Sequence, residues 1–144
     1  MNKEIHISQE SPHGWWIAAL IERFEYYDED QNDPERECLA NRNLTLIKAN
    51  EREEAYSKAL EAGTASNGIE CVNKDGEKGI WIFEGIETLL PIYDQLEDGA
   101  EILCEEFSDL SVKEAKEMVK PKELLECFED MNPKSEPDAS GQRR

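Results

Sequence analysis

Apolar and aromatic residues alternate along residues 15–27, and this pattern constrains the fold more than any other feature of the chain. The even positions from Trp16 to Tyr26 are mostly apolar, which is the period of two expected of a long β-strand with one buried face. A polar, turn-forming segment follows at 27–34, and a second alternating run covers 38–46. The two runs predict an antiparallel hairpin with a long acidic tip.

A helix is expected after the first hairpin. Asn50 and Glu53 have the spacing of a capping box, and apolar residues then recur at helical intervals from Ala55 until Gly63. Since a half-buried sheet needs a covering layer, we expect this central helix to pack on the hairpin.

A second hairpin is predicted from residues 69–72 and 79–83, because the Asp75-Gly76 pair between them favours a tight turn. Residues 80–83 are apolar at both odd and even positions, which suggests a central strand covered on both faces. A turn near Gly99 followed by a fifth strand ending at Phe107 is also expected.

The C-terminal part is expected to be helical. Ser111 and Glu114 form a second capping-box pattern, and Pro121 is placed to start a further helix. The sequence therefore predicts an α+β fold: an antiparallel sheet of four to five strands in two hairpins, one central helix packed on it and two C-terminal helices. We expect a single domain over residues 1–131 and a disordered tail over 132–144.

Four blocks of sequence occur in a fixed order: GWWIAA at 14–19, LTLIKA at 44–49 leading into EEAYSKA at 53–59, WIFEGI at 81–86 and LEDGAEI at 96–102. In this combination the chain resembles, over about residues 14–107, the bacterial family named domain of unknown function 4288. The resemblance implies a small intracellular α+β domain. It implies no catalytic residue, cofactor or ligand.

The charge of the chain limits its partners. There are 34 acidic and 16 basic residues, giving a formal net charge of −18, which repels phosphate backbones and anionic lipid headgroups. Nucleic acids and membrane surfaces are therefore not expected as partners. The same charge would speed the encounter with a basic protein. An acidic composition also serves solubility alone, and this alternative stays open.

The cysteines indicate a reducing compartment. Cys38, Cys71, Cys104 and Cys127 are evenly spread without a CxxC pair, and each lies in an apolar stretch, so we expect buried thiols and no disulfides. The N-terminal residues contain neither a signal-peptide pattern nor an apolar span. A cytoplasmic location is expected.

The sequence offers little catalytic chemistry. Its two histidines, His6 and His13, lie in a weakly patterned N-terminal arm, away from any candidate nucleophile, and the dispersed cysteines do not suit zinc. Asp109, Glu114 and Lys116 are residue types found in metal-dependent nucleases, but Glu114 already has a local role in the capping box. Phosphate-binding glycine motifs are missing. We expect a protein that is not an enzyme and has no cofactor or metal.

Two acidic clusters are the best candidate binding sites. One covers residues 22–37 and includes two arginines; the other covers 94–109, has no basic residue and is interleaved with apolar side chains. An acidic rim around apolar anchors suits a basic protein partner, whereas a charged edge strand protected against aggregation is the competing interpretation. The candidate partner-binding residues of the second cluster are Asp94, Glu97, Asp98, Glu101, Glu105, Glu106 and Asp109.

Size, charge and the missing catalytic motifs favour a protein-binding function. The most specific hypothesis is an immunity protein or antitoxin that neutralises a basic nuclease toxin by occluding its active site. The alternative is a small regulatory or ligand-sensing domain in which Trp15, Trp16, Trp81 and Phe83 line an aromatic pocket. The sequence leaves the oligomeric state and the choice of acidic cluster open.

Overall fold

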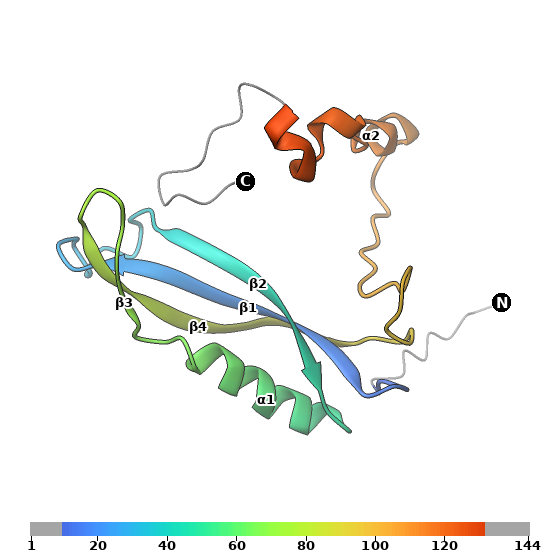
Figure 1. Ribbon diagram of the computed structural model, residues 1–144, viewed down its shortest axis with the longest axis horizontal. Coiled ribbons are helices and arrows are strands. Elements are labelled where there is room, and N and C mark those ends of the chain that lie inside the picture. The colour runs from blue at the N-terminus through green and yellow to red at the C-terminus, as the bar shows by residue number, and fades with distance from the viewer. Residues whose placement is uncertain (1–9, 132–144) are drawn as a thin grey trace. The chain divides into compact units, whose positions relative to one another are not determined.

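The computed structural model describes residues 10–131, which form an α+β fold around a four-stranded antiparallel sheet (Figure 1). Two compact units share these residues: the larger contains 10–72 and 77–104, and the smaller contains 73–76 and 105–131. The expected single domain over residues 1–131 stays a prediction. The larger unit holds β1 (Trp15–Tyr26), β2 (Leu39–Lys48), α1 (Arg52–Thr64), β3 (Glu70–Val72) and β4 (Lys78–Pro91).

The two predicted hairpins are both present, and they join through their first and last strands. The strand order is β2-β1-β4-β3, so β1 is hydrogen-bonded on both sides. The second hairpin turns at Asn73–Gly76, where Gly76 has φ of +83° and its N–H donates to the Asn73 carbonyl. The predicted strand over 79–83 is correct but too short, because β4 continues to Pro91.

The main core lies between the sheet and α1, which runs along one face of the sheet (Figure 1). Alternate residues of β1 point at the helix, beginning with Trp16, whose indole Nε1 donates to the Ala49 carbonyl at 3.1 Å. The helix contributes Ala55 and Ala59, both fully buried, and such small side chains let the helix approach the sheet closely. Helix α1 thus packs on the sheet, and the prediction of one central helix is matched in part. The buried core cluster comprises Trp16, Ala18, Leu20, Ile47, Ala49, Ala55 and Ala59.

The predicted capping box of Asn50 and Glu53 does not form, and that prediction was wrong. The N-cap residue is Glu51, which makes no side-chain capping bond. Because the helix starts one residue later than expected, Glu54 occupies the third helical position, and its carboxylate accepts a hydrogen bond of 2.7 Å from the Asn50 N–H.

Two β-bulges interrupt the ladder between β1 and β4. The register shifts between Ala19 and Leu20 and again between Ile21 and Glu22, which leaves Glu87 and Glu84 of β4 as extra residues. Each extra glutamate pairs with an arginine across the sheet. Glu87 accepts two hydrogen bonds from Arg42, at 2.6 and 3.0 Å, and Glu84 accepts one from Arg23 at 2.5 Å.

The predicted fifth strand is absent from the described chain. The turn before it does form, with Gly99 at φ of +88° and the Ala100 N–H bonded to the Glu97 carbonyl, but residues 101–107 are irregular. A strand here would place Leu103 and Phe107 on one face and Ile102 and Cys104 on the other, with a glutamate on each, so neither face would be uniformly apolar. The four residues of β4 over 80–83 are half-buried, not fully covered as expected.

The smaller unit contains the helix α2 (Val112–Glu117) and two short 3₁₀ helices, Lys122–Leu124 and Glu126–Met131. The Ser111–Glu114 capping box is confirmed, since the Ser111 hydroxyl accepts from the Glu114 N–H and the Glu114 carboxylate accepts from the Ser111 N–H. The second C-terminal helix is matched only in part, because the extended backbone of Leu125 divides it. The predicted tail over 132–144 lies outside the described residues. Within residues 10–131, helices are too short and too polar to cross a membrane.

Candidate functional site

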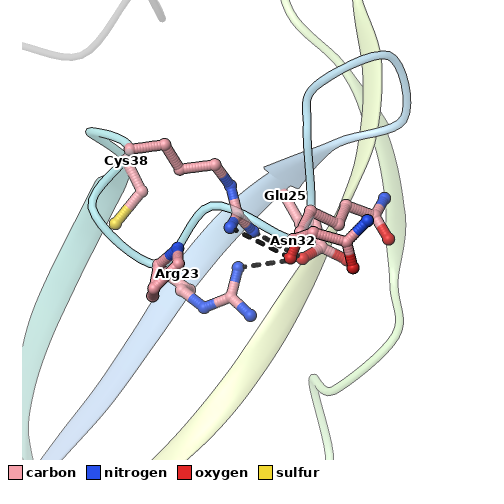
Figure 2. A pocket seen from close by; sticks show the side chains of 7 residues that line it. Arg23, Glu25, Asn32 and Cys38 are labelled. Atoms are coloured by element: carbon pink, nitrogen blue, oxygen red, sulfur yellow. Dashed lines mark hydrogen bonds and ion pairs between the residues drawn. The ribbon is translucent and has the colours of Figure 1, made fainter.

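The loop between β1 and β2, residues 27–38, is here named the acidic tip. Its centre is the half-buried guanidinium of Arg36, which lies 3.1 Å from Glu25 Oε1 and 3.5 Å from Glu29 Oε1. Arg23 reaches the same Glu25 oxygen at 3.1 Å, so two guanidinium groups converge on one carboxylate (Figure 2). These ion pairs tie the loop down onto β1.

Local turns fix the backbone of the acidic tip further. The side chain of Asp30 accepts from the Asn32 N–H, and that of Asp33 accepts from the Glu35 N–H, each at 3.0 Å. Both are Asx turns, in which a short carboxylate replaces a backbone acceptor. Arg36 closes the loop by donating 2.8 Å to the Asp33 carbonyl. The tip is therefore an ordered, preorganised loop.

The carboxylates of the acidic tip divide into two sets. Glu29 is half-buried and, like Glu25 of β1 beneath it, is paired with an arginine inside the loop. The rest face solvent, with the loop's one arginine turned inward, so the outer surface presents negative charge on a fixed backbone. These exposed carboxylates belong to Asp28, Asp30, Asp33, Glu35 and Glu37.

A cavity of about 530 Å³ opens beside the acidic tip (Figure 2). Five of its seven lining residues carry charged or amide side chains, and the buried Nε of Arg36 makes no hydrogen bond beyond its 3.5 Å ion pair with Glu29. Such a lining fits a hydrogen-bonding side chain of a partner better than an apolar ligand. The lining residues are Arg23, Glu25, Gln31, Asn32, Pro34, Arg36 and Cys38.

Tyr27 anchors the acidic tip to the second hairpin. Its N–H donates to the Lys78 carbonyl at 3.0 Å, and its hydroxyl donates to Glu70 Oε2 at 2.7 Å. The hydrogen bond to the Glu70 carboxylate raises the pKa of the Tyr27 phenol, because the neutral phenol is the donor. The N-terminal end of the tip is thus held by β3 and β4.

The second acidic cluster is divided between the two units. Four members gather around one turn of the larger unit, where the Asp94 carboxylate accepts 2.9 Å from the Glu101 N–H and Glu97 and Asp98 are exposed in the turn itself. The other three, Glu105, Glu106 and Asp109, are exposed in the smaller unit. The role of this cluster in partner binding stays a prediction.

The sheet face opposite α1 carries exposed apolar residues. By the strand register, Leu46 and Leu90 flank the buried Ile17, and Leu44 lies beside the buried Ala19. Leu44 is 58% exposed and Leu46 is 50% exposed. The two Arg–Glu pairs made by the bulges lie on the same face, between these leucines and the acidic tip.

A family model matches residues 15–104 of the chain, which is more than half of its length. The chain belongs to the family Domain of unknown function (DUF4288). No curated protein and no solved structure matches the chain. The DUF4288 match ends at Cys104, the residue at which the larger compact unit also ends. The match therefore covers the sheet and α1, and the residues from Glu105 onward lie outside it.

The four aromatics of the ligand-sensing hypothesis have different environments in the DUF4288 domain. Trp16 is a core residue and is 2% exposed, Phe83 packs against α1, and Trp81 makes an edge contact with Phe24. The Lys48 ammonium lies over the Trp15 ring, 4.9 Å from its centroid. Trp15 also lines a cavity of about 490 Å³ between β2 and α1.

The reactive side chains of this DUF4288 protein are mostly at its surface. All four cysteines are free: Cys38, Cys104 and Cys127 are exposed and Cys71 is half-buried, so the expectation of buried thiols was wrong. The short apolar stretches around them do not lie in the main core. His13 is exposed in the turn before β1, and His6 lies outside the described residues. Among residues 10–131, no three potential ligands gather around a metal-sized site.

Proposed function

We propose that this DUF4288 protein is a non-enzymatic binding protein that recognises a basic protein partner through its acidic tip. One observation carries the proposal: five exposed carboxylates sit on a loop whose backbone is fixed by Arg36 and by two Asx turns. A preordered loop loses little conformational entropy on binding, so more of the interaction energy is kept as affinity.

The exposed leucines of the sheet face support the same proposal. Apolar anchors provide most of the affinity in protein interfaces, whereas peripheral charges mainly steer the encounter. Leu46 and Leu90 supply such anchors. They lie on the sheet face toward which Arg23 and Glu25, which line the cavity beside the acidic tip, also point. A basic partner could therefore engage the acidic tip and the leucines together.

In its most specific form the partner is a nuclease toxin, and this protein is its immunity protein or antitoxin. The net charge of −18 supports that assignment, because an inhibitor that occludes a nuclease active site competes for a surface built to accept phosphates.

The proposal is tested with the full chain as bait in an extract of its own host cell at low salt, with elution by rising salt. We expect one basic protein in equimolar amount that is toxic when expressed alone. The variant Asp28→Asn/Asp30→Asn/Asp33→Asn should slow association about tenfold, because rim charges act mainly on the association rate. Asparagine keeps the Oδ1 acceptors of both Asx turns, so the loop shape is retained.

The matched control, Glu97→Gln/Asp98→Asn/Glu101→Gln, removes three charges from the second acidic cluster. If this variant alone slows association, the contact belongs to that cluster instead. If both variants bind as the unmodified chain does, recognition of a basic partner by carboxylates is refuted.

The alternative, a ligand-sensing domain, is favoured by the cavity of about 490 Å³ beside Trp15. A saturable change in tryptophan fluorescence during a small-molecule screen, lost in Trp15→Phe, would support it over the protein-binding proposal.

A further inference from the structure

The outer edge of β2 is an unusually accessible strand edge. β2 is first in the strand order, so within residues 10–131 β1 is its only neighbour in the sheet, and their ladder runs from Leu39 to Lys48 without a register shift. Natural edge strands are commonly protected by bulges, prolines or a short length. β2 has no bulge and no proline over its ten residues, whereas the opposite edge, β3, is three residues long.

The hydrogen-bond pattern shows which backbone groups face outward. The Ala49 N–H donates to the Gly14 carbonyl, so odd-numbered residues of β2 point their backbone groups at β1 and even-numbered ones point away. Ala40, Leu44 and Leu46 thus direct N–H and C=O to the outer edge. The outward row ends at Lys48, whose carbonyl accepts a hydrogen bond of 2.6 Å from Lys58 Nζ.

The charges along this edge are polarised. Residues 38–50 form the longest stretch of the chain without an aspartate or glutamate, although the whole chain carries a net charge of −18. Lys48 and Lys58 lie at the C-terminal end of β2, and the acidic tip, with Glu35 and Glu37, precedes its N-terminal end. An antiparallel copy of the same edge would bring each basic end against the other copy's acidic end.

We propose that two copies of this chain pair through β2, antiparallel about a two-fold axis, to make one continuous sheet. The Lys58 ammonium already occupies the Lys48 carbonyl, so the outward backbone groups of the two copies pair over residues 40–46. In this antiparallel register the two-fold axis passes through Asn43. Ala40 of one copy then faces Leu46 of the other. Continuing that register, Glu37 of the second copy comes beside Lys48 and Lys58.

The cavity between β2 and α1 fits this arrangement. It measures about 490 Å³, and Leu46, Lys48 and Lys58 are among its lining residues. In the proposed dimer, the segment that precedes β2 in the second copy lies beside this cavity. A single strand pairing buries less surface than a standard interface, so we expect a dissociation constant on the order of micromolar. The proposal is independent of the proposed function.

The first test is sedimentation of the full chain over a range of micromolar concentrations. We expect a shift from 16.5 kDa to twice that mass. Leu44→Pro should weaken the dimer about tenfold or more, because proline removes an outward N–H and leaves the bonds to β1 in place. Leu44→Ala keeps the N–H and should dimerise more than Leu44→Pro. A chain that stays monomeric throughout overturns the proposal.

Charge exchange tests the polarity of the pairing. Glu37→Lys and Lys58→Glu should each weaken the dimer, and the double variant should restore it, since the pair meets again with its signs exchanged. Asp28→Asn/Asp30→Asn/Asp33→Asn, which tests partner binding, should leave the dimer unchanged, so the two proposals fail separately. If the double variant dimerises no better than the single ones, Glu37 does not meet Lys58.

Cross-linking tests the register. In a chain whose four native cysteines are replaced by serine, Asn43→Cys lies on the two-fold axis and should form a disulfide between copies under oxidising conditions, since cysteines directly opposite in a non-hydrogen-bonded antiparallel pair suit that bond. Thr45→Cys faces residue 41 of the second copy and should not. Cross-linking of Thr45→Cys in preference to Asn43→Cys contradicts the proposed centre.

Discussion

The ring of Phe83 lies directly against Gly63, so closely that a Cβ atom added to this glycine would overlap the ring. Gly63 is buried inside α1, where glycine normally lowers helix stability, and its value here is the space it leaves for β4. Gly63→Ala should therefore destabilise the domain by about 1–3 kcal/mol, because overpacking outweighs the gain in helix propensity. Urea unfolding measures the change. In a Phe83→Leu background the cost should shrink, and an equal cost in both backgrounds would contradict the contact.

Trp16 should be the more sensitive of the two adjacent tryptophans. Trp16→Phe removes the indole donor and leaves the carbonyl of the buried Ala49 without that bond, at an expected cost of about 1–3 kcal/mol in unfolding free energy. Trp15→Phe loses part of a partly exposed cation–π contact with Lys48, which is worth about 0.5–1 kcal/mol. Denaturation midpoints of the two variants provide the comparison, and a reversed order would show that the Ala49 bond contributes little.

Arg36 should control the order of the acidic tip. Arg36→Met leaves the carboxylates of Glu25 and Glu29 without its guanidinium, and we expect a loss of about 1–3 kcal/mol together with faster amide exchange in the loop. Arg52→Met, at the exposed start of α1, is the control and should change stability by less than about 0.5 kcal/mol. Unchanged exchange in Arg36→Met would mean that the Asx turns alone hold the loop.

Tyr27 gives a pH dependence whose sign is defined. Its pKa in the folded state is raised above the ordinary value of about 10 by the bond to Glu70, so this contribution to stability is complete below that value and is lost as pH rises through the folded pKa. Ultraviolet titration of the phenol should therefore show one tyrosine ionising late. Glu70→Gln should return its pKa toward 10, and a titration unaffected by that change would exclude the bond.

The sequence was sufficient to predict the parts of the fold that depend on local chemistry. Alternation over 15–27 predicted β1, and the Asp75-Gly76 pair predicted the second turn. Both are decided by neighbouring residues, through strand periodicity and through the positive φ that glycine accepts.

The site was predictable only in composition. The acidic cluster at 22–37 and its two arginines are visible in the sequence, but the placement of Arg36 over Glu25 depends on the path of the whole loop. Likewise, the edge position of β2 follows from the strand order, which no local pattern encodes. The division of the second cluster between two units is equally a property of the tertiary contacts.

Each of the two bulges of β4 shifts, by one residue, the alternation of its side chains between the two faces of the sheet. In β4 the residues that face α1 are odd-numbered at Trp81 and Phe83, even-numbered at Ile86 and odd-numbered again at Leu89. The second bulge therefore cancels the shift in alternation that the first one introduces. This explains why simple alternation failed to predict the full length of the strand. Deleting Glu84 alone would move the side chains at one end of β4 to the opposite faces of the sheet relative to those at the other end. Deleting Glu84 and Glu87 together would restore the original faces. Length variation among relatives should therefore occur at these two positions in concert.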